Sequence, residues 1–362
     1  MRPDDTCVLA VDLGTTTVVC RLIDAARGTV LRDVTGPNLQ APFGADVLSR
    51  LSAALDGHAG ELRDLAQQSI LKLISDPSIM HVVIAANSVM AALLVGADAS
   101  GLASAPFTPV RNLQLTAGPL RAALPDARIT VLDPLAAFVG GDARAAAVAC
   151  GLNRADGVGA LIDLGTNAEV LLRAGDTLYV TSAAAGQAFA GGGGRLLPSR
   201  LLAGVVAAQR DGALGTDGRL DGAHASVERA DSGVLGYRWD ADTLISQLLI
   251  RDLQLAKAAV RVALDTLKQH AGVTGPIPVS IAGALGTALD AELLLPLGFI
   301  DGADAGLLRV VGNAALDGAA AIACGRASGA IEGSVAGVDL TVQDGFARKL
   351  LEMTDFPPII DR

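Results

Sequence analysis

The motif Asp-Leu-Gly-Thr occurs twice in this chain, beginning at Asp12 and at Asp163, so the two copies start 151 residues apart. Each copy closes an apolar run that is typical of a buried strand, residues 7–13 and residues 158–164. Two further β-rich runs follow each copy after short turns. Matching motifs separated by about one domain length indicate an internal duplication. The sequence therefore predicts two α/β domains built on one plan.

Both halves are predicted to follow the order β-β-β-α-β-α. The first half gives strands at 7–13, 17–24, 28–34, 81–86 and 129–132, and helices at 46–55, 61–74, 89–95 and from 134 to about 150. The second half gives strands at 158–164, 167–173, 177–181 and 279–282, a loop at 211–236, and helices at 197–209, 243–270, 285–295 and 313–327. The expected domains are 1–150, with the helix at about 313–328 returning to it, 151–312, and a C-terminal extension over 329–362.

The amino-acid composition and the net charge limit the kinds of core and of binding partner that this chain can have. Hydrophobic residues make up 51% of the 362 positions and aromatic residues 3%, so the core must be built from aliphatic side chains. The net charge of −10 gives no general attraction to nucleic acid or to an anionic membrane surface. Residues 79–96 carry no formal charge, but Asn87-Ser88 at their middle favours a buried strand, a cap and a helix over a membrane span.

The cysteines and the first residues bear on cofactors and location. Four cysteines stand far apart, without the spacing of a zinc or iron–sulfur site. They are interpreted as small buried residues of a reducing compartment, and no iron–sulfur cluster is expected in this chain. The N-terminus lacks the pattern of a signal peptide, so a cytoplasmic location is expected. The four histidines do not cluster and are interpreted as surface or packed residues.

The Asp-x-Gly-Thr turn has a chemistry of its own. Glycine permits positive φ, so a tight turn can direct several backbone N–H groups toward one point, and threonine hydroxyls add donors. Such donors suit phosphate oxygens, while an adjacent carboxylate suits a hydrated Mg²⁺ ion. Two such hairpins on facing domains would hold a nucleoside triphosphate from both sides. The sequence lacks a G-x-x-x-x-G-K-[ST] loop, a G-x-G-x-x-G turn after the first strand, and a kinase catalytic loop.

At this point the chain resembles the superfamily of acetate and sugar kinases, heat-shock chaperones and actin, abbreviated ASKHA. The two Asp-Leu-Gly-Thr turns resemble its phosphate-1 and phosphate-2 motifs. Asp133-Pro-Leu-Ala-Ala resembles the first connecting helix, Val279-Ser-Ile-Ala-Gly-Ala-Leu-Gly the adenosine turn, and Val311-Gly-Asn-Ala-Ala-Leu-Asp-Gly-Ala the second connecting helix. The resemblance implies duplicated actin-like (ribonuclease H-like) α/β domains, with mixed five-stranded sheets flanked by helices and a nucleotide cleft between them.

A narrower resemblance points to the ATPase portion of the reductive activators of corrinoid proteins. It rests on Asn38-Leu-Gln-Ala-Pro-Phe-Gly-Ala-Asp-Val-Leu-Ser-Arg, Phe138-Val-Gly-Gly-Asp, Arg251-Asp-Leu-Gln-Leu-Ala-Lys-Ala-Ala and the closing Phe346…Met353…Phe356-Pro. Two departures stand out: the ferredoxin-like iron–sulfur domain of such activators is missing, and the stretch around residues 191–194 is shorter and richer in glycine. That stretch is either the edge of a lid or a plain loop.

The resemblance implies roles for individual residues. Asp12 and Asp163 are the expected catalytic residues, holding Mg²⁺ through water. The expected nucleotide-binding residues are Gly14, Thr15, Thr16, Thr17, Gly165, Thr166, Asn167, Gly283, Ala284, Gly286 and Asn313. Ordinary turn glycines at 283 and 286, and a helix cap at Asn313, are the alternatives. Catalytic or partner-facing roles stay open for Asp133, Asp142, Glu169, Asp46 and Arg50; Glu169 faces either cleft or solvent, and Asp46 and Arg50 could instead form an exposed i,i+4 pair.

The expected function is that of an ATP- and Mg²⁺-dependent ATPase that promotes reduction of an inactive cobalt(II) corrinoid protein to cobalt(I) for methyl transfer. The expected partners are a corrinoid protein of a methyltransferase system and a separate ferredoxin-like electron donor, with no nucleic acid or membrane; a homodimer is one compatible assembly. Two alternatives stay open at this stage: a small-molecule kinase of the same superfamily, and a non-catalytic, nucleotide-gated assembly protein.

Overall fold

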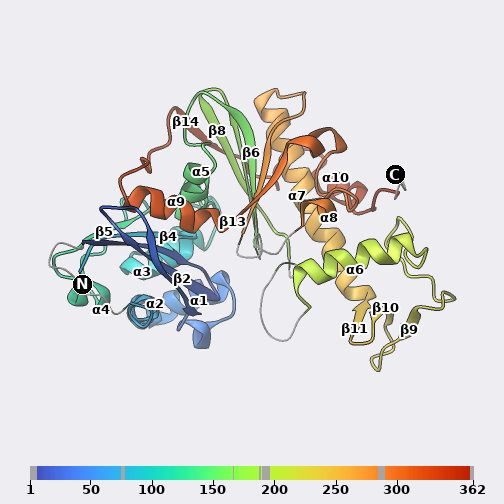
Figure 1. Ribbon diagram of the computed structural model, residues 1–362, viewed down its shortest axis with the longest axis horizontal. Coiled ribbons are helices and arrows are strands. Elements are labelled where there is room, and N and C mark those ends of the chain that lie inside the picture. Colours follow the sequence, from blue (N-terminus) through green and yellow to red (C-terminus); the bar gives the residue numbers. More distant parts are fainter. Residues whose placement is uncertain are drawn as a thin grey trace. The chain divides into compact units, whose positions relative to one another are not determined.

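The computed structural model describes residues 6–74, 78–165, 167–186, 189, 196–283 and 290–358 (Figure 1). The chain divides into two compact units, each described separately below. The first comprises Met1–Asp156, Asp176–Val180 and Ala314–Gly337, and the second comprises Gly157–Gly175, Thr181–Asn313 and Val338–Arg362. Three of the predicted nucleotide-binding residues, Thr166, Ala284 and Gly286, lie outside the described residues. The glycine-rich residues 191–194 also lie outside them.

The first unit is built on a five-stranded sheet in the order β3-β2-β1-β4-β5. Its strands are β1 (Cys7–Leu13), β2 (Thr17–Asp24), β3 (Val30–Pro37), β4 (Ile79–Ala86) and β5 (Arg128–Val131). β1, β2 and β3 pair antiparallel, while β4 is parallel to β1 and to β5. The expected meander is therefore confirmed, with β3 starting two residues later and ending three residues later than predicted.

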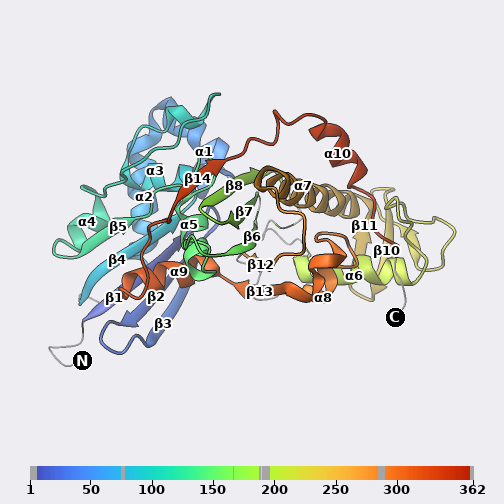
Figure 2. The same ribbon diagram turned by 90° about the horizontal axis from the view of Figure 1, so that it is seen from above.

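Alternating side chains of β1 divide between the two faces of this sheet. Helices cover both faces (Figure 2). Leu9, Val11 and Leu13 join one hydrophobic cluster, which includes residues of the helices α1 (Val47–Ala53), α2 (Ala59–Leu71), α3 (Ser88–Val95) and α4 (Pro119–Ala123). Val8 and Ala10 join the cluster on the opposite face, with residues of α5 (Gly141–Ala149) and α9 (Ala314–Ala323). By this alternation Asp12 belongs to the face that α5 and α9 cover.

The second sheet contains six strands in the order β13-β12-β6-β7-β8-β14. They are β6 (Val158–Leu164), β7 (Ala168–Ala174), β8 (Thr177–Ala183), β12 (Val279–Ala282), β13 (Leu308–Gly312) and β14 (Ser334–Gly337). Read from β8 to β13, the strand order matches that from β3 to β5, and the β6–β7, β6–β12 and β12–β13 pairs have the directions of their counterparts, so the predicted duplication is confirmed. The prediction of five strands missed β14, which pairs parallel with β8 at the sheet edge.

Several predicted elements were wrong. The helix expected from residue 134 begins at Gly141, and an isolated bridge between Ala136 and Val139 stands in its place. The helix expected from residue 243 begins at Gln247, because residues 243–246 form β11 (Thr243–Ser246). The loop at 211–236 contains β9 (Val227–Arg229) and the start of β10 (Leu235–Asp240), which form a separate three-stranded sheet with β11.

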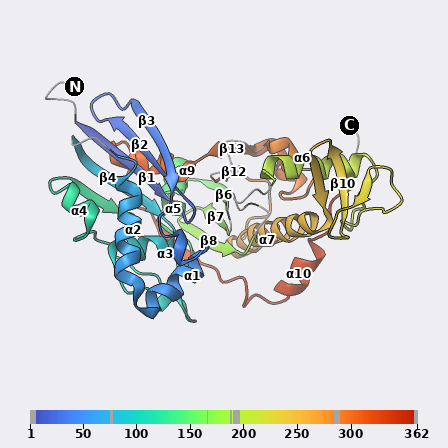
Figure 3. The ribbon, with the colours of Figure 1, turned by 90° about the horizontal axis from the view of Figure 1, so that it is seen from below.

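The other helices of the second unit are α6 (Pro198–Arg210), the long α7 (Gln247–Ala271), the short α8 (Ala291–Leu294) and α10 (Phe346–Glu352) (Figure 3). α7 starts with Ser246 as its N-cap, whose hydroxyl accepts the N–H of Leu249, and ends at Gly272 in the left-handed region. Its inner face packs on β7 and on the C-terminal helix α10. α10 and β13 were not predicted.

In the first unit α5 and α9 cross with almost no separation. A β-carbon added at Gly318 of α9 would lie 1.8 Å from the carbonyl oxygen of Ala145 in α5. No side chain fits at this point, so the backbones themselves are in contact. Small residues therefore let α5 and α9, which follow the two stretches that resemble connecting helices, cross closely; α5 is shorter than the predicted helix.

The segment after α10 is anchored in the second unit by side chains of α7. Gln254 donates to the carbonyl oxygen of Thr354 at 2.9 Å, and the ammonium of Lys257 donates to that of Asp355. The ammonium also lies 5.5 Å from the ring centre of buried Phe356. Two sequence stretches quoted above, Arg251–Ala259 and Phe356-Pro, thus meet in one contact.

Lys257 gives a pH-dependent prediction. Its side chain is 3% exposed, and burial lowers the pKa of its amine from 10.5 to about 8. Between these pKa values the unfolded chain binds the extra proton, so the free energy of unfolding should rise as pH increases from 8 to 10.5, by up to about 3 kcal/mol. In Lys257→Met this contribution should vanish, as measured by urea denaturation at several pH values.

Lys72→Met is the matched control, since Lys72 is exposed. Its pH profile should follow that of the wild type, because the substitution leaves the buried amine of Lys257 in place. Parallel profiles for the wild type and Lys257→Met would show that the buried amine does not couple to folding.

Candidate functional site

The first Asp-Leu-Gly-Thr hairpin lies at the carboxyl ends of β1 and β4. Asp12 is the penultimate residue of β1, and its parallel neighbour on β4 is Ala85. The turn closes through a hydrogen bond from the N–H of Gly14 to the carbonyl oxygen of Thr17 at 3.0 Å. A β-carbon on Gly14 would lie 2.7 Å from that same oxygen, so the turn requires glycine.

Two asparagines hold this hairpin from outside. Asn38 is buried; its amide donates to the carbonyl oxygen of Gly14 at 2.9 Å, and its backbone N–H donates to that of Thr16 at 2.9 Å. Asn87 caps α3 by accepting the N–H of Met90, and its amide donates to the hydroxyl of Thr15 at 3.3 Å. Sequence analysis predicted neither residue as part of the site. A signal existed for Asn87, an asparagine between an apolar strand and an apolar helix.

A second carboxylate stands near Asp12. Asp142 lies in the first turn of α5, where its Oδ1 accepts the N–H of Ala143 at 2.8 Å. Burial, and to a smaller extent the charge of Asp12, raise the pKa of Asp142 to about 7. A β-carbon on Gly140 would lie 2.5 Å from the carbonyl oxygen of Ala86, so the start of α5 abuts the end of β4. The first unit thus brings together the predicted Asp12, Gly14, Thr15 and Asp142.

The second unit repeats the hairpin at the end of β6, with a turn one residue shorter. Gly165 donates to the carbonyl oxygen of Asn167 at 3.0 Å. Asp163 faces Glu169 directly across the β6–β7 pair, so the two carboxylates share one face of the sheet. The hydroxyl of Ser182 donates to Glu169 at 3.4 Å. The parallel neighbour of Asp163 on β12 is Ala282, which leads into the predicted adenosine turn.

Gly283 opens that turn at a φ of 128°, a conformation that other residues rarely adopt. A β-carbon there would lie 2.3 Å from the carbonyl oxygen of Leu164 and 3.2 Å from Oδ1 of Asp163. Its N–H donates to the carbonyl oxygen of Gly312 at 3.2 Å. Half-buried Asn313 follows β13 directly, so Gly283 and Asn313 stand beside neighbouring strand ends.

The remaining candidates form hydrogen bonds with other parts of the first unit. Asp133 accepts the N–H of Leu113 at 3.0 Å. Asp46 caps α1 by accepting the N–H of Ser49 at 2.9 Å. The exposed Asp46–Arg50 pair was wrong: Arg50 is 1% exposed, its Nε donates to the carbonyl oxygen of Gly44, and burial lowers its pKa. Arg50 therefore supports the loop that begins with Asn38, rather than a surface.

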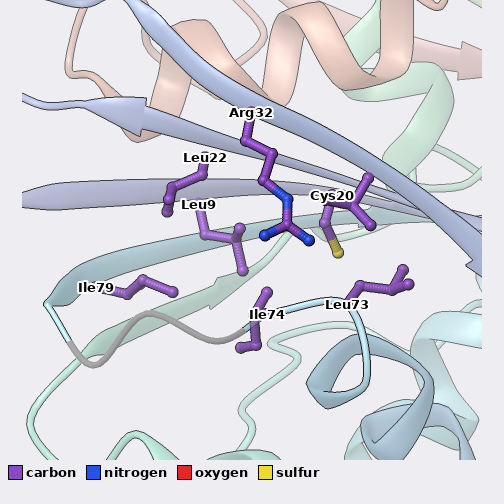
Figure 4. A pocket seen from close by; sticks show the side chains of 8 residues that line it. Leu9, Cys20, Leu22, Arg32, Leu73, Ile74 and Ile79 are labelled. Carbon is purple, nitrogen blue, oxygen red and sulfur yellow. The ribbon is translucent and has the colours of Figure 1, made fainter.

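An apolar cavity of about 130 Å³ lies against the first sheet (Figure 4). Figure 4 shows the side chains of Leu9, Leu22 and Ile74 around it, with the guanidinium of Arg32 and the thiol of Cys20 directed toward it. Burial raises the pKa of Cys20 to about 12, so its thiol stays protonated. The cavity offers hydrophobic packing and no nucleophile.

Comparison with known proteins places the chain. The model described as the RACo middle region matches residues 7–155. The model described as the C-terminal domain of RACo, the ASKHA domain, matches residues 158–196 and 199–359. The chain belongs to the RACo family. The ASKHA fold inferred from the two hairpins is thereby confirmed.

Two relatives are similar over most of this RACo-family chain. A curated protein of Eubacterium limosum, "Corrinoid activation enzyme RamQ", is 27% identical over 376 aligned residues, covering 86% of this chain. The chain spans 63% of the length of that relative. A solved structure, "Reductive activator for corrinoid, iron-sulfur protein", superposes with a TM-score of 0.83 at 24% identity, covering 99% of this chain and 67% of its own. That likeness confirms the fold.

Two general properties concern the described residues as a whole. None of their helices combines the length and hydrophobicity that a bilayer span requires. They also hold no cluster of three or more histidine, cysteine, aspartate or glutamate side chains suited to a metal ion. A Mg²⁺ ion held by one or two carboxylates, phosphate oxygens and water needs no such cluster.

Proposed function

We propose that this RACo-family chain is an ATP-dependent activator that promotes reduction of an inactive cobalt(II) corrinoid protein to cobalt(I). The carrying observation is the pair of Asp-Leu-Gly-Thr hairpins, each at the carboxyl end of the first strand of a duplicated sheet. Membership of the RACo family supports the choice of reaction, because the names of the matched relatives refer to activation of corrinoid proteins.

The residues of the first unit fit a magnesium nucleotide. Asp12 and Asp142 place two carboxylates in one region, where burial and, to a smaller extent, the charge of Asp12 raise the pKa of Asp142 to about 7. A hydrated Mg²⁺ ion bound through Asp12 would add a positive charge to this region. The N–H groups and hydroxyls of the turn at 14–17 would bind phosphate oxygens, and Asn38 and Asn87 keep that turn in place. Bound ATP supplies the free energy that the activation consumes.

In the second unit the same logic gives Asp163 a water-mediated contact with Mg²⁺ and the orientation of the attacking water. Gly165, Thr166 and Asn167 are proposed phosphate ligands. Gly283, Ala284, Gly286 and Asn313 are proposed to lie against adenosine. The close approach of Gly283 to Leu164 supports this assignment, since a β-carbon would close the space beside Asp163.

The proposed partners are a corrinoid protein of a methyltransferase system and a separate iron–sulfur protein that delivers the electron. Hydrolysis by itself moves no electron, so a reductant must accompany ATP in any test.

The test mixes the protein with a cobalt(II) corrinoid subunit, a low-potential reductant and Mg-ATP, and follows the absorbance of cobalt(I). We expect cobalt(I) to form faster with ATP than with ADP or with a non-hydrolysable analogue. No ATP-dependent change with corrinoid subunits encoded by the same genome would contradict the proposal. ADP release that requires one small metabolite would instead indicate a kinase, and ATP-dependent light scattering would indicate an assembly protein.

A further inference from the structure

A second cavity, of about 400 Å³, lies in the first unit beside β5, the edge strand of its sheet. Its walls are the loop 112–114, the strand and loop 128–133, Arg144 of α5, Ile322 of α9 and Gly329. Neither the Asp12 hairpin nor Asn38, Asn87 or Asp142 contributes to this lining. Its volume falls within the range of sites for small molecules.

Arginines gather at this cavity. Arg128 and Arg144 line it. Arg111, next to the lining loop, donates to the carbonyl oxygens of Pro134 and Leu135 at 3.2 and 3.4 Å. Arg144 also donates to Pro134, and its charge interacts unfavourably with that of Arg111. Two guanidinium groups therefore belong to the cavity lining, and a third lies close enough to Arg144 to affect its charge.

These guanidinium groups lack the ion pairs that other arginines of the chain form. Arg21 and Arg261, for example, each contact two carboxylates within 3 Å. Among the described residues, no carboxylate oxygen lies within 4.0 Å of a guanidinium nitrogen of Arg111, Arg128 or Arg144. In a chain with a net charge of −10, an arginine cluster without carboxylates is a local reversal of the overall charge.

Arg144 is held rigidly but without charge compensation. Its Nε donates to the carbonyl oxygen of Asp133 at 2.7 Å, and Nη1 donates to that of Gly329 at 3.1 Å. The group is half-buried, and burial lowers its pKa. Backbone carbonyls orient a guanidinium but do not neutralise it, and its remaining N–H groups are available to a ligand.

The other ionisable groups around the cavity leave it positive. Asp133 lines the cavity and attracts Arg144, but its Oδ1 is engaged by the N–H of Leu113. His81 of β4 contacts the hydroxyl of Thr130 at 3.1 Å, and burial lowers its pKa, so it is neutral at pH 7. One carboxylate thus stands against three guanidinium groups.

We propose that this cavity binds a small organic anion through carboxylate or phosphate oxygens. Arg128 and Arg144 would bind the oxygens, with Thr130, Asn112 and Gln114 as further polar contacts. Leu132 and Ile322 would contact the carbon skeleton. The site is separate from the nucleotide hairpins. We therefore expect the anion and the nucleotide to bind without competing for the same site.

The test is isothermal titration of the full chain, saturated with Mg-ADP, against inorganic phosphate, pyrophosphate, succinate and citrate. Dimethyl succinate is the neutral analogue. We expect at least one anion to bind with one-to-one stoichiometry and the diester to give no heat. Arg128→Gln should weaken that binding by at least about tenfold, because one charge-assisted contact is lost. Comparing the affinities of succinate and citrate with those of phosphate and pyrophosphate shows whether the site prefers carboxylate or phosphate oxygens.

Arg154→Gln is the matched control, since it removes the same charge from an exposed arginine paired with Asp156. It should leave anion affinity unchanged. The side chain of Arg128 forms no hydrogen bond to the described residues, so Arg128→Gln should keep the wild-type melting temperature, and anions should raise that temperature less in the variant. Absence of anion binding, equal affinities of Arg128→Gln and wild type, or anion heat that appears only when Mg-ADP is omitted would each overturn the proposal.

Discussion

Asp12→Asn is expected to lower ATP-dependent cobalt(I) formation on the order of 100-fold, because a neutral amide cannot hold the charge of a hydrated Mg²⁺ ion. The substitution keeps the shape of the side chain at the end of β1. It also removes one of two carboxylates that repel each other, since the charge of Asp12 contributes to the raised pKa of Asp142. The measurements are initial rates with Mg-ATP and a calorimetric titration with the nucleotide.

The fold should survive this change, so the free energy of unfolding is the companion measurement. We expect it to stay within about 1 kcal/mol of the wild type. Asp126→Asn is the control, because Asp126 is an exposed aspartate in a turn before β5 of the same unit. Full activity of Asp12→Asn, or equal losses in both variants, would contradict the proposed role of the first hairpin.

Gly318→Ala is expected to destabilise the protein by at least about 2 kcal/mol, although alanine is the better helix former. The added methyl would lie 1.8 Å from the carbonyl oxygen of Ala145, so α5 and α9 would have to move apart. That movement would disturb the cluster in which Ala145, Leu316 and Ala319 pack against the first sheet. The midpoint of urea denaturation measures the effect.

Gly60→Ala gives the opposite sign from the same substitution. Gly60 is exposed in α2, and a β-carbon there would meet no atom within 4 Å. The variant should gain about 0.5 kcal/mol through helix propensity alone. If both variants shifted in the same direction, the close helix crossing would not be the cause.

Much of the architecture was predictable because it repeats. The duplicated Asp-Leu-Gly-Thr words and the apolar runs around them fixed β1, β2 and β6, whose buried residues leave little freedom of register. These elements depend on local patterns, which a sequence displays directly.

The errors arose where distant contacts decide the local structure. Residues 134–140 have a helical composition, but Gly140 and Gly141 are packed against the ends of β4 and β5, so the helix begins after them. Thr243 and Ile245 continue the alternating pattern of β10 across a turn, and this strand pairing replaced the first turn of the predicted helix. The packing of Gly140 and Gly141 is not visible in a short window, whereas the β10–β11 hairpin is local and its alternating pattern lies within residues 235–246.

The candidate site was predicted less completely than the fold. The two aspartates and their turns were located from the Asp-Leu-Gly-Thr motif alone. Asn38 was missed because it contacts Gly14 from 24 positions away in the sequence. Arg50 looked like a surface charge beside Asp46, and its burial depends on the loop from Asn38 to Gly44 folding over it. Support residues of this kind become visible once the chain is folded.

The parallel pairing of β14 with β8 has a consequence for shortened versions of the protein. This pairing covers the backbone of β8, which corresponds in the duplicated plan to β3 at the edge of the first sheet. A truncation before Ser334 would leave a row of unsatisfied amides and carbonyls along β8, and exposed edges of that kind promote aggregation between molecules. The four residues of β14 thus prevent β8 from pairing with a strand of another molecule.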